Sequence, residues 1–243
     1  MTYCLGIMTH EGLILASDSR TNAGSDDVSV YPKMHKFVLP GERVFVLLSS
    51  GSLSLSQSII TLLDRDFKQG AGLATAKTLY DAARVVGEQV RQMSILDRPT
   101  LERDGYRVNV HFILGGQIRG APHGLYLVYP QGNPLSAAEE SPYLQIGECK
   151  YGRPILVRGI QYSSTSLEEA TKHALISLDS TMRSNVTVGP PIDLAVYTAN
   201  EFRITRYRRL GADDPDLLAI RLQWEKALRN AVRELPAVRF NKP

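Results

Sequence analysis

The sequence predicts an α+β fold in which two stacked antiparallel β-sheets are covered by helices on both outer faces, in four layers. Short apolar strands occur in groups, and amphipathic helices follow each group. The order is strands, two helices, strands, one helix, strands, one helix. No Pro/Gly-rich linker or internal repeat divides the 243 residues, so we expect one domain over residues 1–243.

Composition narrows the class of protein. With 43% hydrophobic and 22% charged residues, the chain is typical of a soluble globular protein that buries a real core. Its formal net charge of +3 is too balanced to indicate nucleic acid or an acidic membrane as a partner. No apolar run approaches the roughly 18 residues of a membrane span, and no signal peptide precedes the first predicted strand. We therefore expect a cytoplasmic protein.

Residues that could hold a metal or cofactor are sparse. The two cysteines, Cys4 and Cys149, lie in no metal-binding spacing, and we expect both to be small core residues. The five histidines form no metal-spaced pair. No phosphate-binding loop is present, so we expect neither a metal nor a cofactor, and any ATP-driven unfolding would need a partner ATPase.

The beginning of the chain predicts a β-hairpin. Residues 3–9 and 13–17 are two apolar runs of similar length with a short polar turn between them. Such a hairpin carries Asp18 back to Thr2, from which it is sixteen residues away in the sequence. The polar stretch 20–29 is expected to be a loop.

The rest of the chain is predicted from periodicity and capping signals. Ser54 with Gln57, and Ser166 with Glu169, have the spacing of capping boxes at helix starts. Asp214 before Pro215 is a further helix start. The expected elements are a hairpin of 31–38 and 44–49, helices after Ser54 and over about 73–93, strands 108–114, 125–129 and 143–146, a helix after Ser166, a hairpin of 192–199 and 201–207, and a helix over about 214–235 with Leu217, Ile220, Trp224, Leu228 and Val232 on its apolar face.

Thr2 carries the first chemical signal. An initiator Met followed by a small residue is expected to be removed, which would leave Thr2 with both a hydroxyl and a free α-amine. A hydroxyl needs a neighbouring base to become a nucleophile, and an N-terminal Thr supplies that base on the same residue.

Four short features together resemble a known family. They are Thr2, Asp18, Lys33 within Tyr-Pro-Lys-Met-His-Lys-Phe, and Gly51 within Ser-Gly-Ser before a long helix. This set resembles the proteasome β-type N-terminal-nucleophile (Ntn) hydrolases of the peptidase T1 family. The Met-Thr-Tyr-Cys start and the Ala-Ser-Asp-Ser-Arg-Thr-Asn-Ala-Gly run resemble Anbu, the bacterial ancestral β subunit, most of all. The resemblance implies a four-layer αββα sandwich.

The resemblance also implies roles for these residues. Thr2 would be the nucleophile and its α-amine the base. Lys33 would keep that amine neutral and stabilise developing alkoxide, and Asp18 would hold the Lys33 ammonium. The N–H of Gly51 would contribute to an oxyanion hole. Lys36 stays open as an alternative to Lys33, because the spacing from Asp18 to Lys33 is one residue shorter than the family pattern.

Further positions follow from the same comparison. Thr21, Asn22 and Ser49 match substrate-binding positions, of which the first two would pair with an extended peptide. Two supporting positions differ from the family pattern: Glu148 replaces a Ser and Ser184 replaces an Asp, whereas Thr187 keeps a hydroxyl. Because these residues would orient the amine, slow or narrow activity is expected. Thr187 also ends an Asn-Val-Thr glycosylation sequon, which has no meaning in the cytoplasm.

Three functions remain open on this basis. The first is a self-assembling threonine peptidase subunit acting on peptides or unfolded proteins. The second is an Ntn amidase acting on a small amide, since the fold does not set the substrate. The third is a catalytically silent ring subunit. By resemblance, a homo-oligomer of roughly a dozen subunits in a ring or open spiral is expected, with small residues such as Ala71, Ala74, Ala82, Ala83 and Gly87 at helix contacts between layers.

Overall fold

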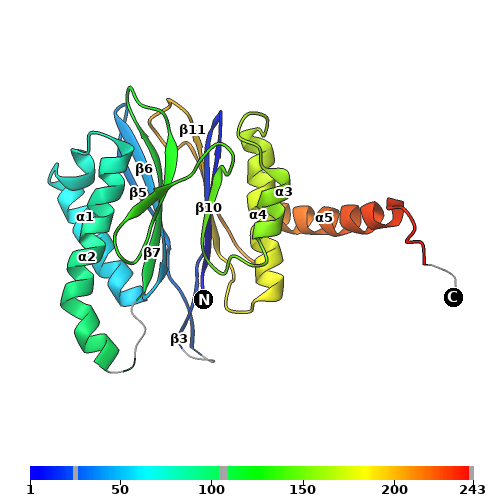
Figure 1. The fold of residues 1–243 in the computed structure, drawn as a ribbon, viewed down its shortest axis with the longest axis horizontal. Helices are drawn as coiled ribbons and strands as arrows, with labels where there is room; N and C mark the ends of the chain where they lie inside the picture. The colour runs from blue at the N-terminus through cyan, green and yellow to red at the C-terminus, as the bar shows by residue number, and fades with distance from the viewer. Residues whose placement is uncertain (24–26, 104, 106–108, 241–243) are drawn as a thin grey trace.

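Two antiparallel sheets lie face to face, and helices cover both outer faces, as predicted (Figure 1). Helices α1 (Leu53–Lys68) and α2 (Leu79–Arg103) cover one sheet, and α3 (Arg153–Gly159) and α4 (Leu167–Ser184) cover the other. The computed structural model describes residues 1–23, 27–103, 105 and 109–240.

The first sheet is built on the N-terminal hairpin. Its strands run in the order β10-β1-β2-β11-β12. Cys4 lies opposite Ser17 and Thr9 lies opposite Gly12, so the predicted hairpin is confirmed and brings Asp18 beside Tyr3. The strands are β1 (Tyr3–Thr9), β2 (Gly12–Asp18), β10 (Tyr143–Gly147), β11 (Ile192–Thr198) and β12 (Arg206–Leu210).

The second sheet has the order β5-β6-β7-β8-β9. Antiparallel pairing of β7 with β8 confirms the partnership expected from their sequence alternation, although Val108 lies outside the described residues. The short strand β9 was not predicted, because three residues carry no periodic signal. The strands are β5 (Met34–Leu39), β6 (Arg43–Gly51), β7 (Val110–Ile118), β8 (Gly124–Val128) and β9 (Pro134–Ser136).

Alternating side chains of the two sheets form three apolar layers. Leu15, Leu48 and Ile113 belong to the core between the sheets. Phe112 belongs to the core shared with α1 and α2, and Leu5 to the core shared with α4. Both faces of each sheet are therefore buried, which explains why the central strands are nearly continuous apolar runs.

The first two helices begin where the sequence analysis did not place them. The N-cap of α1 is Ser52, without a side-chain cap bond, so the predicted capping box at Ser54 is wrong. Helix α2 begins at Leu79, because Thr78 and Asp81 exchange hydrogen bonds of 3.0 Å between side chain and backbone N–H. Leu73, the predicted start, lies in a short 3₁₀ turn, η1 (Gly72–Ala74).

Small residues of α2 pack inside the subunit. Ala82 and Ala83 are fully buried in the core with α1 and the second sheet. A Cβ on Gly87 would lie 2.0 Å from the carbonyl oxygen of Gly132, so this glycine lets α2 approach the β8–β9 turn. The prediction of contacts between subunits is therefore wrong for Ala82, Ala83 and Gly87, which are buried within this one. Ala71 and Ala74 precede α2.

Two polar segments also differ from prediction. Residues 20–29, expected to be a loop, include the strands β3 (Arg20–Ala23) and β4 (Asp27–Val30), which pair with each other. After β11, Asn200 and Phe202 have positive φ angles, so the turn is longer than expected. The returning strand β12 therefore begins at Arg206 rather than at residue 201, with Arg206 opposite Val196.

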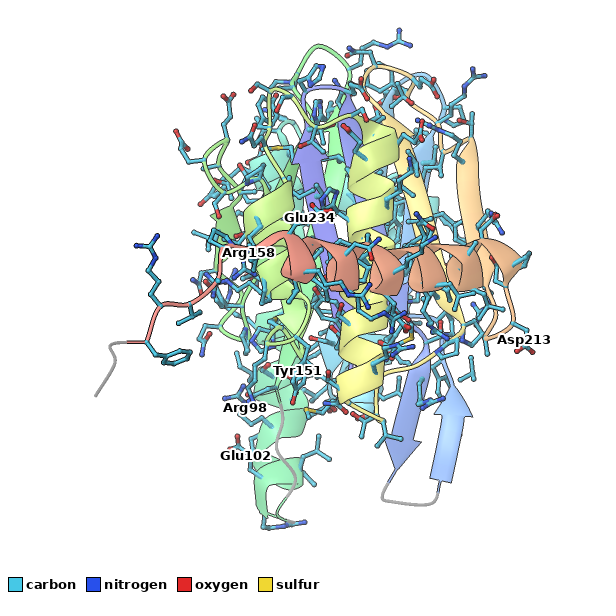
Figure 2. All side chains as sticks on the ribbon, turned by 90° about the vertical axis from the view of Figure 1, so that its right-hand side faces the viewer. Arg98, Glu102, Tyr151, Arg158, Asp213 and Glu234 are labelled. Carbon is cyan, nitrogen blue, oxygen red and sulfur yellow. The ribbon has the colours of Figure 1, made fainter. Side chains whose placement is uncertain are left out.

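The last two long helices both begin where the sequence predicts, but only the first lies wholly against the sandwich. The capping box of Ser166 and Glu169 at the start of α4 is confirmed. The predicted start of α5 (Pro215–Glu234) is also confirmed, because Asp214 caps it. However, α5 lies across α4 and its end extends beyond the sandwich (Figures 1 and 2).

The predicted apolar face of α5 is only partly buried. Leu217 is buried, whereas Leu228 and Val232 are 50% and 60% exposed. On the same helix Leu222 is 66% exposed. The periodicity thus identified an apolar stripe, but much of that stripe has no cover within this subunit.

Candidate active site

One carboxylate joins the beginning of the chain to a buried lysine. Asp18 Oδ1 accepts hydrogen bonds from the backbone N–H of Tyr3 at 3.0 Å and from Lys33 Nζ at 2.7 Å. Its Oδ2 accepts from the N–H of Gly189 at 3.2 Å. Asp18 has no exposed surface and Lys33 is 5% exposed. The carboxylate therefore holds Lys33 beside the residue that follows Thr2.

The structure distinguishes the two candidate lysines. Lys33 Nζ also donates to the carbonyl oxygen of Arg20 at 2.6 Å. Lys36 points elsewhere, with its Nζ 3.7 Å from the centre of the Tyr207 ring. An ammonium has three N–H donors, and Lys33 uses only two of them on acceptors within the described part of the chain. Lys33 thus keeps one donor for the cavity that it lines.

The charged groups of the site shift one another's pKa values. Burial raises the pKa of Asp18, and the Lys33 ammonium with the two backbone donors works in the opposite direction. Burial and then the Lys33 charge lower the pKa of the α-amine at Met1, whereas Asp18 and Glu148 raise it. The Met1 amine is therefore neutral at lower pH than an ordinary α-amine.

Two glycines allow close backbone approach around the site. Gly147 lies opposite Tyr3 with a φ of +86°, and a Cβ there would be 1.9 Å from the carbonyl oxygen of Thr2. Gly51 ends β6 with a φ of +108°, and a Cβ there would be 2.0 Å from the carbonyl oxygen of Asn109. Neither position admits a side chain without displacing the backbone opposite.

A cavity of about 590 Å³ opens beside the start of β1. Its walls come from the two residues before β1, the chain leading into β5, the end of β6, the first turns of α1, and parts of β7, β8 and β10. Asp18 is not part of the lining, and the backbone of Asn22 pairs with Val28 in the β3–β4 hairpin. Of the predicted site residues, those that line the cavity are Thr2, Thr21, Lys33, Ser49 and Gly51.

The supporting residues form a group behind the start of the chain. The N–H of Glu148 donates to the carbonyl oxygen of Thr2 at 2.7 Å. Asn185 Nδ2 donates to the Glu148 carboxylate at 3.1 Å, and Asn185 Oδ1 accepts from the N–H and Oγ1 of Thr187 at 3.0 and 2.6 Å. Ser184 is exposed at the end of α4 and lies outside this group and the cavity lining.

Asn185 is the connecting residue that sequence reasoning missed. The sequence marked it only as the first residue of a sequon, which carries no information about contacts with Glu148. Cys149 also differs from prediction, since it is partly exposed and lines the cavity, whereas Cys4 is buried as expected. Within the described residues, no three His, Cys, Asp or Glu side chains gather as they would around a metal ion.

Comparisons with known proteins agree with this architecture. The chain is 42% identical to the Gly-1 mutant of Anbu from Hyphomicrobium sp. strain MC1, covering 99% of this chain and 100% of that one with a TM-score of 0.91. It is 41% identical to Anbu from Pseudomonas aeruginosa, solved as a helical assembly, covering 98% of each chain with a TM-score of 0.92. It is 29% identical to a proteasome subunit beta of Haloferax volcanii, over 85% of this chain and 77% of the other. No family model matches the chain.

The stacked sheets, their helix layers and these relatives define a proteasome β-like subunit. Within that class the chain belongs to the Anbu family, the ancestral β subunits. No helix among the described residues is both long enough and apolar enough to cross a membrane.

The Asp18–Lys33 pair makes a prediction about stability. Asp18→Asn leaves the Lys33 ammonium buried without a counter-ion, so we expect the free energy of unfolding to fall by about 3–5 kcal/mol. Adding Lys33→Met to that variant removes the second charge, so the double variant should lose less than the sum of the two single variants. Urea denaturation at one fixed protein concentration, followed by circular dichroism, measures the three values.

Lys36→Met is the matched control. Its ammonium is exposed over an aromatic ring, so we expect a loss of less than about 1 kcal/mol. Strict additivity of the Asp18 and Lys33 losses would contradict a direct interaction between these side chains.

Proposed function

We propose that this chain is a threonine hydrolase acting on peptide bonds, with Thr2 as the nucleophile after removal of Met1. The observation that carries the proposal is the Asp18–Lys33 pair, because the same carboxylate oxygen also binds the N–H of Tyr3. A buried ammonium is thereby fixed beside the position at which the freed α-amine would begin the chain. A merely structural ion pair does not need a cavity in front of its ammonium, and Lys33 lines one.

The proposed reaction uses the hydroxyl and the amine of one residue. Thr2 Oγ1 attacks the substrate carbonyl carbon, and the Thr2 α-amine accepts the hydroxyl proton, directly or through a water. The proton then passes to the leaving amine as the peptide bond breaks, which leaves an ester on Thr2. Water, activated by the same amine, hydrolyses that ester and restores the hydroxyl. Lys33 keeps the amine neutral by charge repulsion and stabilises the attacking oxygen.

Neighbouring groups complete the proposed site. The N–H of Gly51, just before α1, would donate to the oxyanion of the tetrahedral intermediate. Thr21 at the cavity and Asn22 next to it belong to β3, whose backbone would pair with an extended peptide. Asn185 and Glu148 would orient the amine in place of the usual Ser and Asp of the family pattern.

One observation favours a second candidate, a catalytically silent subunit. Ser184, at the position where the family pattern has an Asp, is exposed and outside the site.

The cavity of about 590 Å³ lies in the size range of ligand pockets and exceeds what one small amide fills, which favours a peptide over the small-amide alternative.

We also propose that the chain forms a homo-oligomer of roughly a dozen subunits, in which helical surfaces meet. The helical assembly of the relative from Pseudomonas aeruginosa supports association of identical subunits. The uncovered apolar side chains of α5, among them Leu228 and Val232 of the stripe and Leu222 beside it, supply an apolar surface for a second copy.

Thr2→Ala tests the nucleophile. We expect kcat/KM on a peptide-amide library to fall at least about a thousandfold, because no other residue supplies the attacking hydroxyl. Folding and assembly should not change, since the substitution removes one hydroxyl and one methyl. The measurement compares wild-type and variant proteins whose Met1 removal has been verified by intact-mass spectrometry.

The control is Thr187→Ala, which removes a hydroxyl from the supporting group but leaves the attacking one. Its activity should be reduced and measurable. Equal activity of Thr2→Ala and wild type would exclude the mechanism, and an inactive but correctly processed wild type would leave the silent subunit as the function.

The pH dependence of kcat/KM tests the base. Activity should rise with pH as the Thr2 amine loses its proton. Burial and Lys33 lower the pKa of the Met1 amine one residue away, so we expect the same influences to put the midpoint below the ordinary value of about 8. Glu148 raises the pKa of the Met1 amine, so Glu148→Gln should move the midpoint to lower pH. Glu140→Gln, at an exposed position outside the cavity lining, is the matched control. A midpoint that moves upwards in Glu148→Gln would contradict this role of the amine.

Leu222→Glu tests the proposed assembly. Leu222 is an exposed apolar side chain of α5, and a charge there would be desolvated against a second copy, so sedimentation velocity at micromolar concentration should show smaller species than for wild type. Gln223→Glu adds the same charge at the adjacent exposed position and is the matched control. An unchanged distribution for Leu222→Glu would remove α5 from the interface, and a monomeric or dimeric wild type would overturn the assembly itself.

A further inference from the structure

The cavity beside Thr2 has an unusual charge pattern. None of the side chains that line it, all within the described part of the chain, is an Asp or a Glu. Of the two carboxylates placed in the site, Asp18 has both of its oxygens engaged, and Glu148 accepts a hydrogen bond from Asn185; neither lines the cavity. Among the described lining residues a basic side chain would therefore find no counter-ion, and it would approach Lys33.

Two histidines line the cavity. His35 lies on β5, and the same lining includes Leu53 and Gln57 of α1. His111 lies near the start of β7, opposite Ser50 of β6. The remaining ionisable side chains of the lining are Lys33, Tyr31, Tyr129 and Cys149, of which Lys33 is bound to Asp18.

The surroundings of His35 keep it neutral near pH 7. Burial lowers its pKa, and the weaker opposing influences are the backbone at Pro32, Asp193 of β11 and Asp64 of α1. Both of these carboxylates have cationic partners: Asp193 receives bonds from Arg209, and Asp64 from Lys68. Burial likewise lowers the pKa of His111. At neutral pH both rings are polar but uncharged, and protonation adds positive charge to a cavity whose described lining residues include no carboxylate.

We propose that this cavity accepts uncharged and acidic substrate side chains and rejects Lys and Arg, with His35 and His111 as the residues that set its response to charge. The inference rests on the proposed function in one respect only: both assume that the ligand is a peptide. A Lys side chain is rejected because it loses hydration without gaining a partner. A Glu side chain gains affinity as the pH falls, because each protonated imidazole becomes a cationic donor.

The test measures binding, so that it does not depend on catalysis. Three peptides with uncharged ends, identical except for a central Gln, Glu or Lys, are titrated into the full-length Thr2→Ala protein by calorimetry at pH 7.5 and pH 6.0. We expect the Lys peptide to bind at least about tenfold more weakly than the Gln peptide at both pH values. The affinity ratio of Glu to Gln should rise by about threefold or more on acidification, because Gln is the uncharged isostere of Glu.

Histidine variants assign the effect to the two rings. The double variant His35→Gln/His111→Gln should show the same ratio of Glu-peptide to Gln-peptide affinity at both pH values. It should still bind the Gln peptide more tightly than the Lys peptide. His10→Gln, on the exposed β1–β2 turn and outside the cavity lining, is the matched control and should keep the rise. A flat ratio in the parent protein, or Lys binding as tightly as Gln, overturns the proposal even if the histidine variants fail to fold. Failure to bind any of the peptides overturns it as well.

Hydrolysis of the same peptides by wild type separates the two proposals. The binding pattern without any hydrolysis would support the charge selection and contradict the threonine hydrolase. Equal hydrolysis of the Gln, Glu and Lys peptides would contradict the charge selection and leave the hydrolase intact.

Discussion

The site depends on one constraint, the bridging of Tyr3 and Lys33 by a single oxygen of Asp18. That contact requires the β1–β2 hairpin to keep its register, since a slip of one residue would turn Asp18 to the other face of the sheet. It also requires close backbone approach at Gly147, beside the carbonyl oxygen of Thr2. Because the carboxylate and the ammonium are both buried, neither is tolerated without the other. Fold and proposed chemistry therefore share one set of interactions.

Local patterns predicted the parts of the fold that local interactions determine. The N-terminal hairpin follows from two apolar runs of similar length, and this alone brought Asp18 to the start of the chain. The Ser166 capping box was also found, because its hydrogen bonds join residues three apart. Choosing Lys33 over Lys36 needed the resemblance, since spacing left both open, and the structure then placed only Lys33 next to Asp18.

The features that the sequence did not reveal depend on distant contacts. Asn185 joins Glu148 from 37 residues away, and no periodic signal reports such a pairing. The apolar stripe of α5 indicated a buried helix, but stripes look the same whether their own subunit or a second copy covers them. The small residues of α2 were assigned to contacts between subunits, whereas Gly87 is needed for the approach of Gly132 within the subunit.

The central claim is that Thr2, freed of Met1 and placed next to Lys33, is the nucleophile. Its most direct test is to treat the processed protein with a peptide epoxyketone or a β-lactone and to locate the adduct by mass spectrometry of its peptides. The account predicts one covalent adduct on Thr2 that Lys33→Ala strongly slows, because the amine is then protonated more readily and the attacking oxygen loses its cationic neighbour. An adduct on another residue, such as Cys149 in the same cavity, would contradict the account, and so would a processed wild type that stays unmodified.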